Sequence, residues 1–473
     1  QLSEQRRETV LGLMLKYHYL TQAAYERAMA EKIFVVGSGK PPRSYTAVYP
    51  PAQPKVTDPY FVSYAEQYLA NVLTARYGAS AAATMLAQGG LQIYTTLKPD
   101  LQADALAAVN HYLAGTHPPL VEAVASVDPA AGWVVAMVGG RNFAQSQVNL
   151  ALGGCPTPQP PPVRLLVVPT CAAGNTVTGG GSGRQPGSSF KLFTLLRILE
   201  MGYGPNSTFN APVTYPIPGC VPTSHQDCLI HNDGGVPSGQ VTLDVATWDS
   251  INTVYVQMIQ RTGIEPVAEL AKEMGITSAY DESDFNISYA LGDIPVSPLD
   301  MATAYATVAD RGLYHAASPI EKVVGPDGQL LYSDLNPKGQ QVVPARIAEL
   351  ATSILQGVIK QGTGYPNAQI GRPAAGKTGT TNSFHDAWFV GYTPQLAAAV
   401  WMGYANNEST PLLNIDGYPQ VYGGTVPAAT WSSYMKAALA NSPVVPFTAP
   451  PPSAATPAQT ITSIEPGPAR TLV

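Results

Sequence analysis

Hydrophobic positions recur at helical spacing in several separate segments of this chain. One face of a helix repeats every three to four residues, so this spacing predicts helices. They are predicted at 4–32 (two helices broken near His18, the second capped by Thr21), 60–78, 99–113, 190–202, 243–263, 267–274, 298–310 and 344–361. The segment 190–202 is apolar on nearly every side, which is typical of a buried helix.

Runs of β-branched and apolar residues predict strands at the two ends of the central region. In the first, 121–140, two runs are joined by Asp128, Pro129 and Gly132, which indicates a hairpin. Further strands are predicted at 91–97, 374–381, 386–392 and 396–404. Strands at both ends of a helical body predict an α/β (α+β) fold, in which one central antiparallel sheet is flanked by helices.

The chain of 473 residues is too long for one ordinary core and is expected to divide. Residues 1–54 hold the two short helices and a Pro-rich stretch, and 55–120 are expected to form a small linker domain. The main domain is expected at 121–441. Residues 442–473 are rich in Pro, Ala and Thr, which predicts a flexible tail.

Composition narrows the possible partners. The net charge is −6 and no Lys/Arg run is present, which argues against nucleic acid as a partner. No stretch approaches the roughly 18 consecutive apolar residues of a membrane-spanning helix. Neither an initiator Met nor a signal peptide begins the chain, so we expect a processed or truncated product.

Four cysteines lie in segments rich in Pro and Gly, away from clustered histidines, so no metal site is predicted. Four cysteines allow three pairings. The sequential one, Cys155 with Cys171 and Cys220 with Cys228, closes two loops and implies an oxidising, extracytoplasmic compartment. The alternative is four free thiols.

The strongest local signal for chemistry is RQPGSSFK, in which Pro186 and Gly187 form a turn before a helix. Ser188 and Lys191 then share one helix face, because positions three apart are neighbours. A serine hydroxyl is a weak nucleophile, and a neutral lysine amine can activate it. Alone, this pair is a weak signal, because an ordinary helix cap with a solvated lysine gives the same pattern.

Two further elements follow in the sequence. Ser250 and Asn252 interrupt a helical pattern, although this tripeptide alone is more typical of a simple helix junction. The segment AGKTGTTN is a strand that carries Lys377, and its glycines allow another backbone to approach closely. A Ser/Lys helix start, a Ser-x-Asn turn and a Lys-Thr-Gly strand together match the signature of penicillin-binding proteins and class A β-lactamases.

Beyond these motifs, the chain resembles class A penicillin-binding proteins over most of its length. The resemblance rests on GLQIYTTLKPDLQ, DPAAGWVVAMVGGRNF, RQPGSSFK, ALGDIPVSPLDMATAYATVADRG, AGKTGTTNSFHDAWFVGYTP and GGTVPAATW. It implies the transpeptidase fold that these proteins share with serine β-lactamases. It also implies a cofactor-free peptidoglycan D,D-transpeptidase on the extracytoplasmic face of the bacterial membrane, with stem peptides and β-lactams as partners.

The resemblance assigns roles to the motif residues. Ser188 would attack the carbonyl between the last two D-alanines, with Lys191 as general base. Ser250 would relay a proton to the leaving D-alanine, and Asn252 would bind the substrate backbone. Lys377 would supply positive charge near Ser250.

The strand of the third motif has binding roles in the same comparison. Thr378, Gly379 and Thr380 would line the substrate site, with the two threonines holding the terminal carboxylate. The backbone N–H groups of Ser188 and Thr380 would form the oxyanion hole.

The chain departs from class A members in two respects. We expect the chain to lack their glycosyltransferase domain and membrane anchor, because 1–54 resembles only the end of that domain and the linker after it. The loop that holds Cys155 and Cys171 is longer than expected.

The alternative functions are a D,D-carboxypeptidase, a serine β-lactamase, and an inactive β-lactam sensor or wall-binding scaffold. The chain lacks the Glu-x-x-Leu-Asn pattern of class A β-lactamases, which argues against the β-lactamase.

Overall fold

The computed structural model divides the chain into two compact units, Gln1–Thr57 and Asp58–Val473. The residues that it describes are 2–35, 39–40, 46–48, 56–152, 183–217, 220, 228–233, 239–277, 286–405, 410–450 and 460–461.

The first unit contains two helices and two short strands. Its elements are α1 (Leu2–Lys16), α2 (Gln22–Ala30), β1 (Ile33–Val35) and β2 (Thr46–Val48), and the strands pair in parallel. The predicted break falls where His18 adopts a positive φ of 63°. The Thr21 hydroxyl accepts a hydrogen bond from the Ala24 N–H, which confirms the predicted helix cap.

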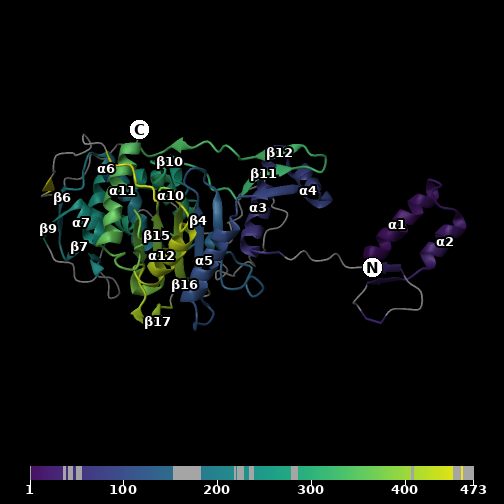
Figure 1. The fold of residues 1–473 in the computed structure, drawn as a ribbon, viewed down its shortest axis with the longest axis horizontal. Helices are drawn as coiled ribbons and strands as arrows, with labels where there is room; N and C mark the ends of the chain where they lie inside the picture. Colours follow the sequence, from purple (N-terminus) through teal and green to yellow (C-terminus); the bar gives the residue numbers. More distant parts are fainter. Residues whose placement is uncertain are drawn as a thin grey trace. The chain divides into compact units, whose positions relative to one another are not determined.

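The second unit contains the remaining elements, which Figure 1 labels where there is room. Its helices are α3 (Pro59–Tyr77), α4 (Ala79–Gln88), α5 (Pro99–Tyr112), α6 (Lys191–Glu200), α7 (Leu243–Trp248), α8 (Asn252–Thr262), α9 (Ile264–Glu273), α10 (Pro298–Ala309), α11 (Ala345–Lys360) and α12 (Val426–Ala438), with short 3-10 turns at η1 (Leu150–Leu152), η2 (Gly187–Phe190), η5 (Ile287–Leu291) and η6 (Asn382–Phe384).

Its strands form one large sheet and several small ones. They are β3 (Gln92–Thr95), β4 (Leu120–Val127), β5 (Val134–Val138), β6 (Thr208–Ala211), β7 (Thr214–Pro216), β8 (Leu229–His231), β9 (Gly239–Thr242), β10 (Leu313–Tyr314), β11 (Ile320–Val324), β12 (Leu330–Ser333), β13 (Gln340–Gln341), β14 (Ala375–Thr380), β15 (Asp386–Tyr392), β16 (Ala397–Tyr404), β17 (Leu413–Ile415), β18 (Tyr418–Gln420) and β19 (Thr460–Ile461).

The large sheet has five antiparallel strands in the order β14-β15-β16-β4-β5. Successive side chains of a strand point to opposite faces. On β16, Val400 and Met402 therefore belong to the apolar cluster that includes residues of α5 and α12, while Trp401 belongs to the cluster with residues of α6, α10 and α11 on the other face. Helices cover both faces, which confirms the predicted central antiparallel sheet flanked by helices (Figure 1).

A smaller antiparallel sheet joins segments that are distant in the sequence. Its order is β12-β11-β3, so the predicted strand near residue 93 pairs with residues more than two hundred positions away. Helix α3 packs on it: the Tyr68 and Tyr332 hydroxyls lie 3.1 Å apart, and the Tyr77 hydroxyl donates to the Leu331 carbonyl at 3.0 Å.

Part of the segment expected to be a flexible tail packs against other residues of the second unit. The ring of Phe447 packs edge-on against that of Tyr392, with 5.6 Å between centroids. The Arg372 guanidinium donates to the carbonyls of Leu439 at 2.7 Å and Ser442 at 3.2 Å. These contacts fix the chain as it leaves α12.

We therefore expect that removing residues 442–473 lowers the melting temperature by about 1–3 °C, because the apolar contact of Phe447 is lost. Removing only 451–473 keeps Phe447 and is the matched control. Thermal unfolding of both deletions and the full chain measures the difference. Equal melting temperatures for the two deletions would show that residues 442–450 contribute nothing to stability.

Candidate active site

Ser188 lies on the 3-10 turn η2, immediately before α6 begins at Lys191. The turn packs tightly against β14, and Gly187 has a positive φ of 53°. A Cβ on Gly187 would lie 2.5 Å from the Thr380 carbonyl oxygen, and one on Gly379 would lie 2.1 Å from the Pro186 oxygen. Both positions therefore require glycine, and their contact places Ser188 beside the third motif.

Hydrogen bonds fix both sides of this turn. The Trp388 indole N–H donates to the Gln185 carbonyl at 2.8 Å, and the Tyr305 hydroxyl donates to the Ser189 carbonyl at 2.8 Å. Trp388 is on β15 and Tyr305 is on α10, so the large sheet and a buried helix hold the backbone around Ser188.

Ser250 occupies the junction between α7 and α8. Its φ is 56°, a left-handed conformation that a non-glycine residue adopts at a cost of about 1–3 kcal/mol. The Lys191 amine donates to the Ser250 carbonyl at 2.7 Å, and the Ser250 N–H donates to the Thr247 carbonyl at 3.2 Å. The predicted helical segment 243–263 is thus broken where the Ser-x-Asn element was recognised.

Two lysine amines meet at the Ser250 hydroxyl. Lys191 Nζ lies 3.1 Å from Ser250 Oγ, and Lys377 Nζ lies 2.8 Å from the same atom. Lys191 also donates to Asn252 Oδ1 at 2.6 Å, and its amine lies 5.0 Å from the ring centre of Tyr255. The structure therefore brings one residue from α6, one from β14 and the Ser-x-Asn junction into direct contact.

Burial changes the protonation of both lysines. Lys191 and Lys377 are 0% and 1% exposed. Burial lowers the pKa of Lys191 well below 10.5, the charge of Lys377 lowers it further, and Asp233 opposes the shift. Burial lowers the pKa of Lys377 to about 7, again opposed by Asp233. Lys191 is therefore suited to act as a neutral amine, and Lys377 is partly protonated near neutral pH.

The β14 strand forms another side of the site. Thr378 and Thr380 are two residues apart and share one face of the strand. The Thr378 hydroxyl lies 2.8 Å from that of Thr363, and Thr380 Oγ1 accepts the Gly423 N–H at 3.1 Å.

A cavity of about 210 Å³ opens next to Ser188. It is lined by Gln185, Gly187, Ser188, Leu229, Ile230, His231, Asp233, Asn252, Ser288, Leu291, Gly292, Asp293, Thr380, Thr381 and Asn382. Of the predicted site residues, Ser188, Asn252 and Thr380 line it, whereas Lys191, Ser250, Lys377, Thr378 and Gly379 do not.

Sequence reasoning missed the wall formed by residues 229–233. The Asn252 amide donates to the His231 carbonyl at 2.9 Å, and Asn232 Oδ1 accepts the Thr253 N–H at 2.9 Å. The segment carries no motif, and neither its pairing with β7 nor its approach to α8 is visible in the sequence.

The expected disulfide between Cys220 and Cys228 is present, with the two Cα atoms 5.6 Å apart. The other expected pair, Cys155 with Cys171, lies outside the described residues. No group of three or more His, Cys, Asp or Glu side chains within the described ranges is arranged to hold a metal ion.

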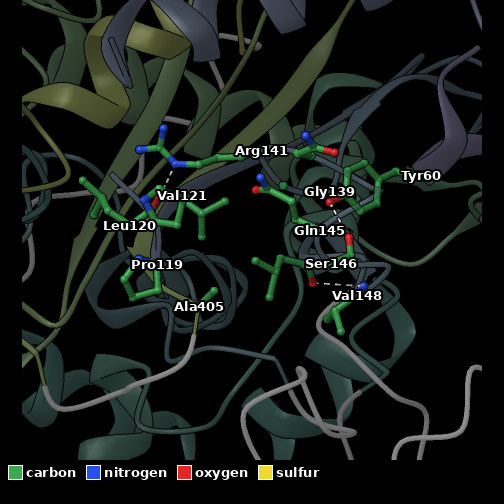
Figure 2. Close-up of a pocket in the computed structure, with 14 residues that line it drawn as sticks. Tyr60, Pro119, Leu120, Val121, Gly139, Arg141, Gln145, Ser146, Val148 and Ala405 are labelled. Atoms are coloured by element: carbon green, nitrogen blue, oxygen red, sulfur yellow. Dashed lines mark hydrogen bonds between the residues drawn. The ribbon is translucent and has the colours of Figure 1, made fainter. Parts of the chain in front are cut away.

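Another cavity, of about 280 Å³, lies elsewhere in the large unit. Figure 2 shows it between Pro119–Val121 on one side and Gly139–Val148 on the other, with Tyr60 donating to the Ser146 carbonyl at 2.8 Å. None of the predicted site residues lines it. Its walls are mostly apolar and hold no nucleophile paired with a base, so it is not the candidate active site.

Comparison with known proteins identifies the family. Residues 123–436 match the penicillin binding protein transpeptidase domain. Penicillin-binding protein 1A of Mycolicibacterium smegmatis is 32% identical over 380 residues, which cover 76% of this chain and 43% of the relative. Penicillin-binding protein 1A of Aquifex aeolicus is 31% identical over 344 residues, which cover 72% of this chain and 42% of the relative.

Solved structures agree with this match. The structure of the PonA1 protein from Mycobacterium tuberculosis in complex with penicillin V superposes with a TM-score of 0.67 and 29% identity, covering 83% of this chain and 96% of that one. The chain therefore belongs to the penicillin-binding protein transpeptidase family, and the expected fold is confirmed. It spans less than half the length of the curated relatives named above. In the described ranges, no helix has both the length and the hydropathy that crossing a bilayer requires.

The two lysines predict how stability depends on pH. In the unfolded chain Lys377 returns to its ordinary pKa of 10.5, whereas in the folded chain it is about 7. Between these values the unfolded state binds more protons, so the free energy of unfolding should rise with pH.

Lys377→Met removes this buried amine. We expect the variant to melt above the wild type near pH 7. The difference in melting temperature should shrink toward about pH 10, because the lysine then loses its proton in the unfolded chain as well. Thermal unfolding across this range measures it, with Lys360→Met on the exposed end of α11 as control. A variant that melts below the wild type near pH 7 would show that Lys377 stabilises the fold through its charge.

Proposed function

We propose that this chain is a peptidoglycan D,D-transpeptidase that forms an acyl-enzyme on Ser188 and is inhibited covalently by β-lactams. The observation that carries the proposal is the convergence of two buried lysine amines on Ser250 Oγ, next to Asn252, which lines the same cavity as Ser188. Membership of the transpeptidase family supports the same activity.

Acylation would begin with the neutral amine of Lys191. It removes the hydroxyl proton of Ser188 as the oxygen attacks the carbonyl of the penultimate D-alanine, a step for which a positioned base supplies roughly 100- to 10,000-fold in rate. The N–H groups of Ser188 and Thr380 would stabilise the oxyanion, typically by about 3 kcal/mol each.

The leaving group needs a proton. Lys191 lies 3.1 Å from Ser250 Oγ, so the proton taken from Ser188 can pass to Ser250 and then to the nitrogen of the departing D-alanine. Lys377, 2.8 Å from the same oxygen, makes the hydroxyl a better donor when protonated. The C–N bond breaks, and the acyl group remains on Ser188.

The substrate backbone would lie along β14, an edge strand of the large sheet. Thr378 and Thr380 would hold its terminal carboxylate, Gly379 would allow close approach, and Asn252 would bind an amide of the peptide. An amine of a second stem peptide then attacks the ester carbonyl and forms the amide bond of the cross-link. The C–O bond to Ser188 breaks, and the amine proton passes to the Ser188 oxygen.

The proposed location is the extracytoplasmic face of the bacterial membrane. Peptidoglycan stem peptides are assembled into the wall there, and the Cys220–Cys228 disulfide favours an oxidising compartment.

A serine β-lactamase would use the same nucleophile but needs a base that activates water against the ester. The chain lacks the Glu-x-x-Leu-Asn pattern, and the part of the cavity lining that the structure describes contains no glutamate.

We therefore expect penicillin to form one adduct that persists on the wild-type protein. Ser188→Ala should form no adduct while keeping its melting temperature. Intact-protein mass spectrometry over time measures both. Rapid return to the unmodified mass with continued penicillin turnover would favour the β-lactamase.

A D,D-carboxypeptidase differs in the acceptor, which is water. With a stem-peptide mimic ending in D-Ala-D-Ala, we expect release of D-alanine to rise when an amine acceptor is added and a cross-linked product to accumulate. Chromatography of both products measures the partition. Hydrolysed peptide alone, at every amine concentration, would assign the chain as a carboxypeptidase.

A further inference from the structure

The β7–β8 ribbon is a small structure that ends at the candidate active site. Only three residue pairs join its strands, Thr214 with His231, Tyr215 with Ile230 and Pro216 with Leu229. An isolated two-stranded ribbon is at best marginally stable in water. The Cys220–Cys228 disulfide links the chain just beyond both strands, where Cys228 holds a left-handed φ of 58°.

The far end of the ribbon fixes the Asn252 amide. Asn252 Nδ2 donates to the His231 carbonyl at 2.9 Å, while Asn252 Oδ1 accepts from Lys191 at 2.6 Å. The oxygen and nitrogen of one amide have fixed relative positions. The place of the His231 carbonyl therefore decides which atom of Asn252 faces the lysine.

The next residue fixes the start of the helix that carries Asn252. Asn232 Oδ1 accepts the Thr253 N–H at 2.9 Å, an otherwise open donor in the first turn of α8. Asn232 Nδ2 donates to the Pro212 carbonyl at 3.0 Å, and the Thr253 hydroxyl donates to the same carbonyl at 3.0 Å. Further along α8, the Tyr215 hydroxyl donates to Gln260 Oε1 at 2.7 Å.

The same wall supplies a charge. Asp233 follows Asn232 and lines the cavity, and its charge opposes the lowering of both lysine pKa values. Residues 231–233 thus contribute a carbonyl, a helix cap and a carboxylate to one side of the site.

We propose that the disulfide-closed ribbon β7–β8 is a positioning element for the acylation reaction: the Cys220–Cys228 bond holds residues 231–233 in place, and these hold Asn252 against Lys191. Opening the bond leaves the protein folded but slows acylation of Ser188. The inference rests on the proposed function, since it assumes that Ser188 is the residue acylated.

The test opens the bond chemically in the folded protein. A small dithiol reagent gives two electrons and two protons to the Sγ–Sγ bond, which becomes two thiols as the reagent closes to a cyclic disulfide. The starting protein is Cys155→Ala/Cys171→Ala, in which Cys220 and Cys228 are the only cysteines left. Fluorescent penicillin is added to oxidised, reduced and re-oxidised samples, and both the rate constant and the final extent of labelling are measured.

We expect the rate constant to fall on the order of tenfold to a hundredfold on reduction, because a catalytic group held about an ångström out of place costs this much. The final extent of labelling stays complete, and re-oxidation restores the rate. An unchanged rate constant would overturn the inference. A smaller extent of labelling at an unchanged rate constant would also overturn it, because that result indicates partial unfolding without misplacement of Asn252.

A second variant tests the contact without reducing agent. Asn232→Ala removes the cap on α8, and Asn232→Ser keeps a neutral side-chain acceptor at this position. We expect Asn232→Ala to slow labelling while Asn232→Ser recovers part of the rate, whereas equal rates for the two variants would contradict the positioning role. If the oxidised starting protein does not label at all, the proposed function fails, and this outcome is distinct from loss on reduction.

Discussion

The burial of two amines around one hydroxyl is the constraint on which the rest of the site depends. Lys191 and Lys377 are almost completely excluded from water, and both lie within hydrogen-bond distance of Ser250 Oγ. Two ammonium groups cannot both stay charged so close together in a medium of low dielectric constant. At least one must give up its proton, and the neutral amine that results is the base that a serine nucleophile needs.

Helices and the central sheet enclose these two lysines. Helix α6 carries Lys191 within the core, where its neighbours Leu192, Phe193 and Leu195 are buried, and α11 covers β14, which carries Lys377. Ser250 is kept in a left-handed conformation by contacts from both sides. The stability lost at the site is offset by the two large apolar clusters that lie on either face of the central sheet.

The sequence revealed the parts of this arrangement that are local. The Ser188–Lys191 spacing, the break at Ser250 and the glycines around Lys377 are each visible within a few residues, and the strands at 121–140 and 374–404 follow from alternation. The sheet β12-β11-β3 and the wall at 229–233 depend on contacts between distant segments. The sequence also could not predict that Asp233 acts on the two lysines, because a single exposed carboxylate carries no motif and the fold alone brings it to the site.

The order of strands in the large sheet has a consequence for how the molecule is made. Strands β4 and β5 are synthesised before β16, which pairs with the other edge of β4, and helices α6 to α11 and most of the site lie between them in the sequence. Such long-range pairing closes slowly, because loop entropy is lost before any contact compensates for it. A growing chain therefore holds an unpaired edge on β4 until β16 has been made. The two lysines can meet at Ser250 only after β14, which carries Lys377, has emerged, so shorter chains lack the buried pair of amines.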